Sequence, residues 1–95
     1  MASMADMTTA LNLAKTRLNR HPGDNSIDVI LMAYLEAAEA DLDGNGIHLT
    51  SSMDDLLLLV DTAVWRYQSR DNPDEMPKWL RLRRRERWLR EGRCT

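Results

Sequence analysis

Three clusters of turn-forming residues divide this 95-residue chain into four segments, and each segment has apolar residues at helical spacing. The clusters are His21-Pro22-Gly23, Gly44-Asn45-Gly46 and Asp71-Asn72-Pro73. Proline interrupts a helix because it lacks an amide hydrogen, and glycine adopts the turn conformations that end one. No segment alternates apolar and polar residues as a β-strand does. The sequence therefore predicts an all-α fold.

We expect one domain over residues 1–95, a small four-helix domain with a basic C-terminal helical arm. The expected helices span about residues 8–20, 26–43, 52–70 and 77–91, and residues 92–95 are expected to form a flexible tail. A chain of this length removes only about 60–65% of its unfolded surface from water, so its stability as a monomer should be modest.

The second expected helix has an apolar face and an acidic face. Asp24, Asn25 and Ser26 are candidate N-caps, since their side chains accept hydrogen bonds from the first helical amides. The apolar face comprises Ile27, Ile30, Leu31, Tyr34, Ala38 and Leu42. The opposite face carries Asp28, Glu36, Glu39 and Asp43.

The third expected helix begins with a capping box, Ser-x-x-Asp, and has apolar residues on two sides. Its broad apolar face comprises Leu56, Leu57, Leu59, Val60, Ala63, Val64 and Tyr67. Leu58 and Trp65 fall on the other side, seven residues apart. We expect them to form a contact between subunits, and the alternative is that a loop of the same chain covers them.

The fourth expected helix has a narrow apolar seam of Trp79, Leu82 and Leu89, while Leu80 and Trp88 fall outside it. We expect the helix to lie on its domain through this seam and to present arginines and Trp88 to a partner. Arginine and tryptophan are enriched where binding energy concentrates in protein interfaces. The expected partner-binding arm comprises Trp79, Leu80, Arg81, Arg83, Arg84, Arg85, Arg87, Trp88 and Arg90.

Charge is separated along the chain although the net charge is only −2. Residues 24–61 hold nine acidic side chains and no Lys or Arg, and residues 78–93 hold eight basic and two acidic side chains. The two regions either neutralise each other, within or between subunits, or serve partners. A nucleic-acid-binding module is the alternative function, with arginines on phosphates and Trp79 or Trp88 stacked on a base. The pI near 5.6 and the lack of a recognition-helix pattern count against it.

Asp41-Leu42-Asp43-Gly44-Asn45-Gly46 matches the first half of an EF-hand loop, which makes Asp41, Asp43 and Asn45 weak metal candidates. The second half of the loop does not match an EF-hand. Ser52 stands at the position where an EF-hand has a glutamate that binds calcium through both carboxylate oxygens. A helix C-cap followed by a glycine turn is the interpretation we favour. His21 and His48 are isolated in sequence and no Gly-rich phosphate loop occurs, so we expect no enzyme, no cofactor and no metal.

The chain has no apolar run long enough to span a bilayer, and its first residues lack the pattern of a secretory signal. We therefore expect no membrane association and synthesis in a cytoplasm. The single cysteine, Cys94, cannot form an internal disulfide.

From Gly46 onward the order of features resembles the small head-to-tail connector (adaptor, or head-completion) proteins of tailed phages and prophages. The start of the chain also fits, with Leu11 to Arg20 as a first helix and Asp28 to Leu42 as a second, so the resemblance covers about residues 8–90. The segments that carry it are Gly46-Ile47-His48-Leu49-Thr50, Asp54-Asp55-Leu56-Leu57-Leu58-Leu59-Val60, Ala63-Val64-Trp65-Arg66-Tyr67 and Pro77-Lys78-Trp79-Leu80-Arg81-Leu82-Arg83-Arg84-Arg85-Glu86-Arg87-Trp88-Leu89.

This resemblance implies a structural virion protein that assembles in the host cytoplasm and resides in the virion neck. Its subunits would form a homo-oligomeric ring of about a dozen copies. The ring would contact the portal protein and a tail-side completion protein, and DNA would pass through it without sequence-specific binding. By position, the arm that engages the portal would run from Trp79 to Arg90.

Overall fold

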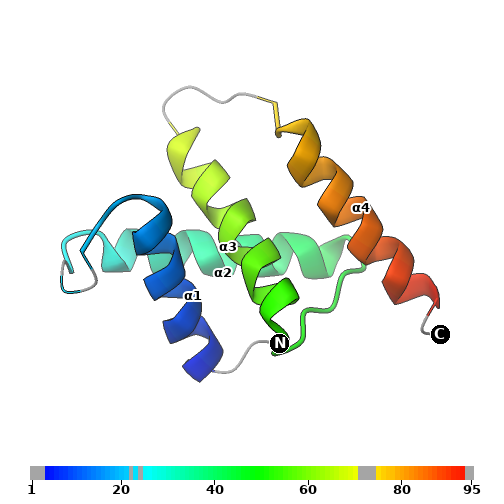
Figure 1. Ribbon diagram of the computed structural model, residues 1–95, viewed down its shortest axis with the longest axis horizontal. Coiled ribbons are helices and arrows are strands. Elements are labelled where there is room, and N and C mark those ends of the chain that lie inside the picture. Colours follow the sequence, from blue (N-terminus) through cyan, green and yellow to red (C-terminus); the bar gives the residue numbers. More distant parts are fainter. Residues whose placement is uncertain (1–3, 22, 24, 71–74, 94–95) are drawn as a thin grey trace.

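The computed structural model describes residues 4–21, 23, 25–70 and 75–93, and this part of the chain contains helices and no strand. The helices are α1 (Met4–Arg17), α2 (Asp28–Gly44), α3 (Met53–Gln68) and α4 (Lys78–Arg93). Figure 1 shows α3 between α1 and α4, with α2 crossing behind them. The prediction of an all-α, four-helix fold is confirmed. None of the described helices combines the length and apolar character of a membrane span.

Helix α1 runs from Met4 to Arg17, so it begins and ends earlier than the predicted 8–20. It ends where Asn19 adopts a left-handed conformation, with φ of 58°. The amide of Arg20 then donates to the carbonyl of Lys15 at 2.7 Å, which closes the helix end. Asparagine tolerates this conformation better than most residues, and the turn therefore forms before Pro22, which lies outside the described residues.

Helix α2 ends through the same motif, built on Gly46 with φ of 88°. The amide of Ile47 donates to the carbonyl of Leu42 at 2.9 Å, and that of Gly46 donates to the carbonyl of Asp43 at 3.0 Å. Ile47 and Leu42 are both buried, as is typical of this cap. The interpretation of this segment as a helix C-cap with a glycine turn is confirmed. At the other end the N-cap is Ile27, without a side-chain cap bond, so the prediction of Asn25 or Ser26 as the N-cap is wrong, and Asp24 lies outside the described residues.

Replacing Gly46 with alanine should destabilise the fold by about 1–2 kcal/mol, because an L-residue is strained in the left-handed region. The new Cβ would also lie 3.3 Å from Nε1 of Trp88. Gly44 is the matched control, since a Cβ there meets nothing within 4 Å. Gly44→Ala should be neutral or stabilise the helix by up to about 1 kcal/mol. Chemical denaturation measures both free energies of unfolding, and equal effects would contradict the left-handed cap.

Helix α3 is the centre of the core and is buried on nearly every side from Asp55 to Val64. Leu58 is only 3% exposed, so its predicted place on a subunit-contact stripe is wrong for this conformation of the chain. Trp65 is half-buried and packs against the same core. The reason is that α4 covers the second side of α3, where a loop was the alternative expected from the sequence. Ile30 of α2, predicted in the apolar face, is instead 49% exposed.

Helix α4 packs against α3 in the orientation opposite to the predicted one. The seam residues Trp79, Leu82 and Leu89 are 51%, 48% and 39% exposed, whereas Leu80 is completely buried. The side that faces the body of the domain carries Leu80, Arg83, Arg84 and Arg87. The predicted seam is therefore wrong. The helix also continues to Arg93, so residues 92 and 93, predicted as part of a flexible tail, are helical, and residues 94–95 lie outside the described residues.

Candidate functional site

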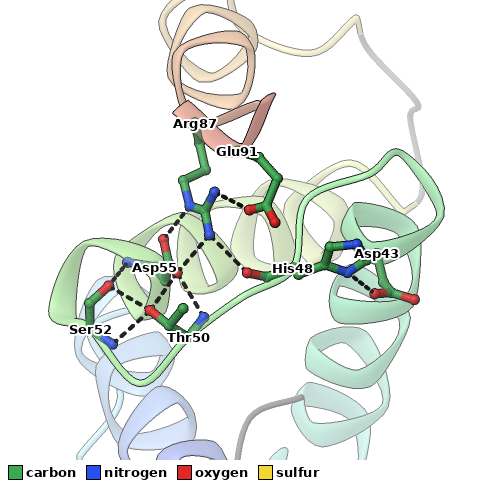
Figure 2. A network of polar contacts seen from close by, with 7 residues as sticks. All are labelled: Asp43, His48, Thr50, Ser52, Asp55, Arg87 and Glu91. Carbon is green, nitrogen blue, oxygen red and sulfur yellow. Dashed lines mark hydrogen bonds and ion pairs between the residues drawn. The ribbon is translucent and has the colours of Figure 1, made fainter. Parts of the chain in front are cut away.

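Arg87 is the main polar contact between α4 and the rest of the domain. Its Nε donates to Oδ1 of Asp55 at 2.8 Å, and its Nη2 donates to Oδ2 of Asp55 at 3.2 Å and to the carbonyl of His48 at 2.8 Å. Its Nη1 donates to Glu91 at 2.5 Å, one helical turn along α4. Figure 2 shows the guanidinium enclosed by these acceptors. With all three nitrogens in use, Arg87 holds α4 at a fixed position on α3.

Asp55 receives Arg87 because it is already held at the start of α3 (Figure 2). Its Oδ2 accepts from the amide of Thr50 at 2.7 Å and from the Thr50 hydroxyl at 2.8 Å. Its own amide donates to Oγ of Ser52 at 3.3 Å, so Ser52 is the N-cap of α3, and Ser52 and Asp55 form the Ser-x-x-Asp pattern. The acidic side chain of the capping box therefore reaches Thr50 rather than the Ser52 amide, which donates to the Thr50 hydroxyl.

The electrostatics of this cluster favour the ionised forms. Burial on its own would raise the pKa of Asp55, but hydrogen bonds from Arg87 and Thr50 outweigh it and lower that pKa. The hydrogen bond to Asp55 raises the pKa of Arg87, against the effect of burial. The hydrogen bond from Arg87 lowers the pKa of Glu91. The cluster is thus a charged contact that keeps its protons fixed at neutral pH, unlike a general acid or base, whose pKa lies near the working pH.

Asp61 joins three helices through one buried carboxylate. Its Oδ1 accepts from Nη1 of Arg17 on α1 at 2.5 Å, and its Oδ2 accepts from Nη1 of Arg83 on α4. The Asp61 side chain is 2% exposed, whereas the two arginines keep 47% and 37% of their surface in solvent. A buried carboxylate with two charged donors is compensated, so α1 and α4 are both tied to α3.

The three weak calcium candidates each contact other protein groups, and the two aspartates do not converge on one point. Asp41 pairs with Nη2 of Arg84 at 3.1 Å, and Asp43 pairs with Nδ1 of His48 at 2.8 Å. The Asn45 side chain donates to the carbonyl of Asp41 at 2.8 Å. Both aspartates lie inside α2, two residues apart, so their side chains diverge by about 200° around the helix. Among the described residues no three acidic, histidine or cysteine side chains gather as a metal site would require.

The exposed side chains of α4 form two surfaces. The first surface, which we call the outer stripe, consists of Trp79, Leu82 and Leu89 and points away from the rest of the domain. The basic groove lies on the other flank, where Trp88 is 52% exposed and contacts the α2 turn at Gly46. This groove has a volume of about 290 Å³ and is lined by Asn45, Ile47, Met76, Arg81, Arg84, Arg85 and Trp88. Within the described residues, Lys78, Arg81, Arg85 and Arg90 form no ion pair.

The predicted partner-binding arm therefore divides into two groups. The members that face solvent are Trp79, Arg81, Arg85, Trp88 and Arg90. The members that face the body are Leu80, Arg83, Arg84 and Arg87. The sequence pattern did not identify Asp41, Asp55 and Asp61 as the acceptors, although the separation of acidic and basic segments was a signal that some of these charges would meet.

Helix α4 is thus a helix whose inner arginines fix it in place and whose outer side chains are free to contact a partner. Comparisons with protein-family models, with curated proteins and with solved structures give no match to this chain.

Proposed function

We propose that this chain is a structural virion protein, a head-to-tail connector (adaptor) subunit that forms a ring beneath the portal of a tailed phage or prophage. The observation that carries the proposal is the outward side of α4, where four large apolar side chains, Trp79, Leu82, Trp88 and Leu89, are 39–52% exposed. Exposed apolar residues of this size, clustered on one helix, mark a surface that binds another protein.

The composition of this surface supports docking to a protein. Its tryptophans and its unpaired arginines are the residue types that dominate interface energetics. The helix is also held before binding, by Arg87 on Asp55 and Arg83 on Asp61. A partner therefore meets a preformed surface, and binding does not have to supply the entropy of ordering α4.

Two exposed sides of α4 suit the two kinds of contact that a connector makes. In our proposal the basic groove around Trp88 engages an acidic surface of the portal protein, and the outer stripe contacts a neighbouring subunit. A tail-side completion protein would bind the opposite rim of the ring. DNA would pass without sequence-specific binding. The pairing of three α4 arginines with Asp41, Asp55 and Asp61 also lowers the positive charge that could hold DNA phosphates.

We expect the purified chain to form rings of about a dozen subunits at high concentration or when mixed with its portal. Native mass spectrometry and negative-stain images over a range of concentration and salt measure this, with the 11.0 kDa chain as the monomer reference. Arg81→Glu should weaken portal binding, and Arg66→Glu, a charge change on α3 outside the groove, serves as its control. A chain that stays monomeric in every condition and binds no portal would contradict the proposal.

Nucleic-acid binding is the second candidate, and the basic groove is the observation that favours it. Trp88 beside Arg81 and Arg85 could stack on an exposed base while the arginines contact phosphates. In that case affinity for single-stranded DNA must fall steeply with salt and drop in the Arg81→Ala, Arg85→Ala double variant. Weak binding without a salt dependence would exclude this function.

A further inference from the structure

A second exposed apolar surface lies far from α4, on the first turns of α2. It is an open groove of about 500 Å³ lined by Leu11, Asp28, Val29, Met32, Ala33 and Glu36. Val29 is 84% exposed there, which is a high value for a branched apolar side chain on a helix. Asp28 and Glu36 border the groove and make its rim acidic. We call this surface the acidic-rimmed groove.

The charges at this rim are only partly compensated by the same chain. Asp28 pairs with Nζ of the buried Lys15 at 2.6 Å. Glu36 is exposed and forms no ion pair within the described part of the chain. An apolar floor with an acidic edge therefore suits an apolar ridge with a basic edge.

The outer stripe of α4 is such a ridge. Leu82 and Leu89 are seven residues apart on one side of the helix, with Arg85 between them. Trp79 lies one turn before Leu82, and Lys78 and Arg90 stand near the two ends. Glu86 is the one acidic residue on this side of the described helix. The stripe is thus apolar along its length and basic at its edge.

The two surfaces cannot meet within one chain. Figure 1 shows α1 and the first turns of α2 at one end of the long axis and α4 toward the other. The long axis of the molecule measures 41 Å. A contact between two different patches of identical chains is heterologous, so a bound pair still offers one free stripe and one free groove, and the chain of contacts closes into a ring when the rotation per copy permits.

We infer that the outer stripe of one copy docks into the acidic-rimmed groove of the next copy, with Leu82 and Leu89 against Val29 and Met32 and with Arg85 beside Glu36. The closure of this contact into a ring rests on the proposed function, whereas the contact itself does not. The occupant of the groove is a second copy of this chain.

Two blocked variants test the contact directly. Leu82→Glu places an acid on the stripe, and Val29→Lys places a base on the groove; both positions are exposed, so the fold should remain intact by circular dichroism. Each variant alone should stay monomeric at concentrations where the wild type associates. Mixed together they should form a heterodimer of two 11.0 kDa chains, because the first retains its groove and the second retains its stripe.

The control is Ile30→Lys, which adds the same charge at the next residue of α2, outside the groove. It should associate like the wild type. Association of Val29→Lys on its own would overturn the inference and indicate a stripe-to-stripe contact. If both variants and the wild type form rings alike, the inference is wrong while the proposed function stands. If the wild type neither associates nor binds a portal, both are wrong.

Discussion

Replacing Asp55 with alanine should lower the melting temperature of this domain by roughly 12–24 °C, which corresponds to about 3 kcal/mol in a chain of this size. The Asp55 side chain is 5% exposed and accepts hydrogen bonds from Arg87 and from Thr50. Its removal takes two hydrogen bonds from the guanidinium of Arg87, which is 11% exposed and keeps only Glu91 and the carbonyl of His48 as acceptors. A small domain has about 5–10 kcal/mol of stability in total, so the loss is a large part of it.

Asp54 provides the matched control for this change. It is the preceding residue in the first turn of α3, and it is exposed. Asp54→Ala removes a carboxylate near the positive end of the helix without breaking a buried pair, so it should lower the melting temperature by less than about 5 °C. Calorimetry of both variants measures the difference, and similar losses in the two would show that the Arg87 contact contributes little.

The same carboxylate makes stability depend on pH in a defined direction. The pKa of Asp55 is lower in the folded chain than its ordinary value, so the folded state binds fewer protons than the unfolded state in the acid range. The stabilisation is therefore complete above the unfolded pKa of about 3.9 and is lost as the pH falls through the folded pKa. Denaturation curves between pH 7 and pH 2 should show a steeper acid loss in the wild type than in Asp55→Ala.

The elements of this fold could be predicted from the sequence because their ends depend on local chemistry. Gly46 ends α2 through its left-handed conformation, and Ser52 caps α3 through its hydroxyl. Each needs only a few neighbouring residues. The end of α1 was misplaced because Asn19, a less common residue in the left-handed region, forms the turn before the more obvious Pro22.

The orientation of α4 could not be predicted, since it depends on contacts with distant residues. A helical wheel compares the faces of a helix by their apolar content. By that measure the face with Trp79, Leu82 and Leu89 should be buried in preference to the face with Leu80 alone. The face with Leu80 is nevertheless the buried one, because its arginines pair with acceptors on α2 and α3. These acceptors are Asp41, Asp55 and Asp61. Charged side chains face inward where each has a partner, and the wheel carries no information on partners.

The separation of charge along the chain is therefore explained in part within one subunit. Three arginines of the basic segment pair with three aspartates of the acidic segment. This confirms the interpretation that the two regions neutralise each other within the chain, for these pairs. The exposed Lys78, Arg81, Arg85 and Arg90 remain as the charge that a partner or a second copy would meet.

Replacing Leu80 with alanine should destabilise the packing of α4 by about 2–4 kcal/mol, whereas Leu82→Ala should change it by less than about 0.5 kcal/mol. The two leucines lie two residues apart on one helix, and the substitution is identical. Leu80 is completely buried in the core, while Leu82 is 48% exposed. The sequence pattern alone predicts the reverse result, since it places Leu82 in the seam and Leu80 outside it.

The loss in Leu80→Ala should be concentrated in α4. Among the described helices, the backbone of α4 lies close to that of α3 only, and α4 reaches α2 through side chains such as Arg84 on Asp41, while α1, α2 and α3 all pack on one another. Hydrogen exchange should therefore accelerate first for the α4 amides, and those of α3 should keep their protection until the domain unfolds. Uniform acceleration through α3 and α4 would contradict this expectation and would mean that α4 unfolds together with the core.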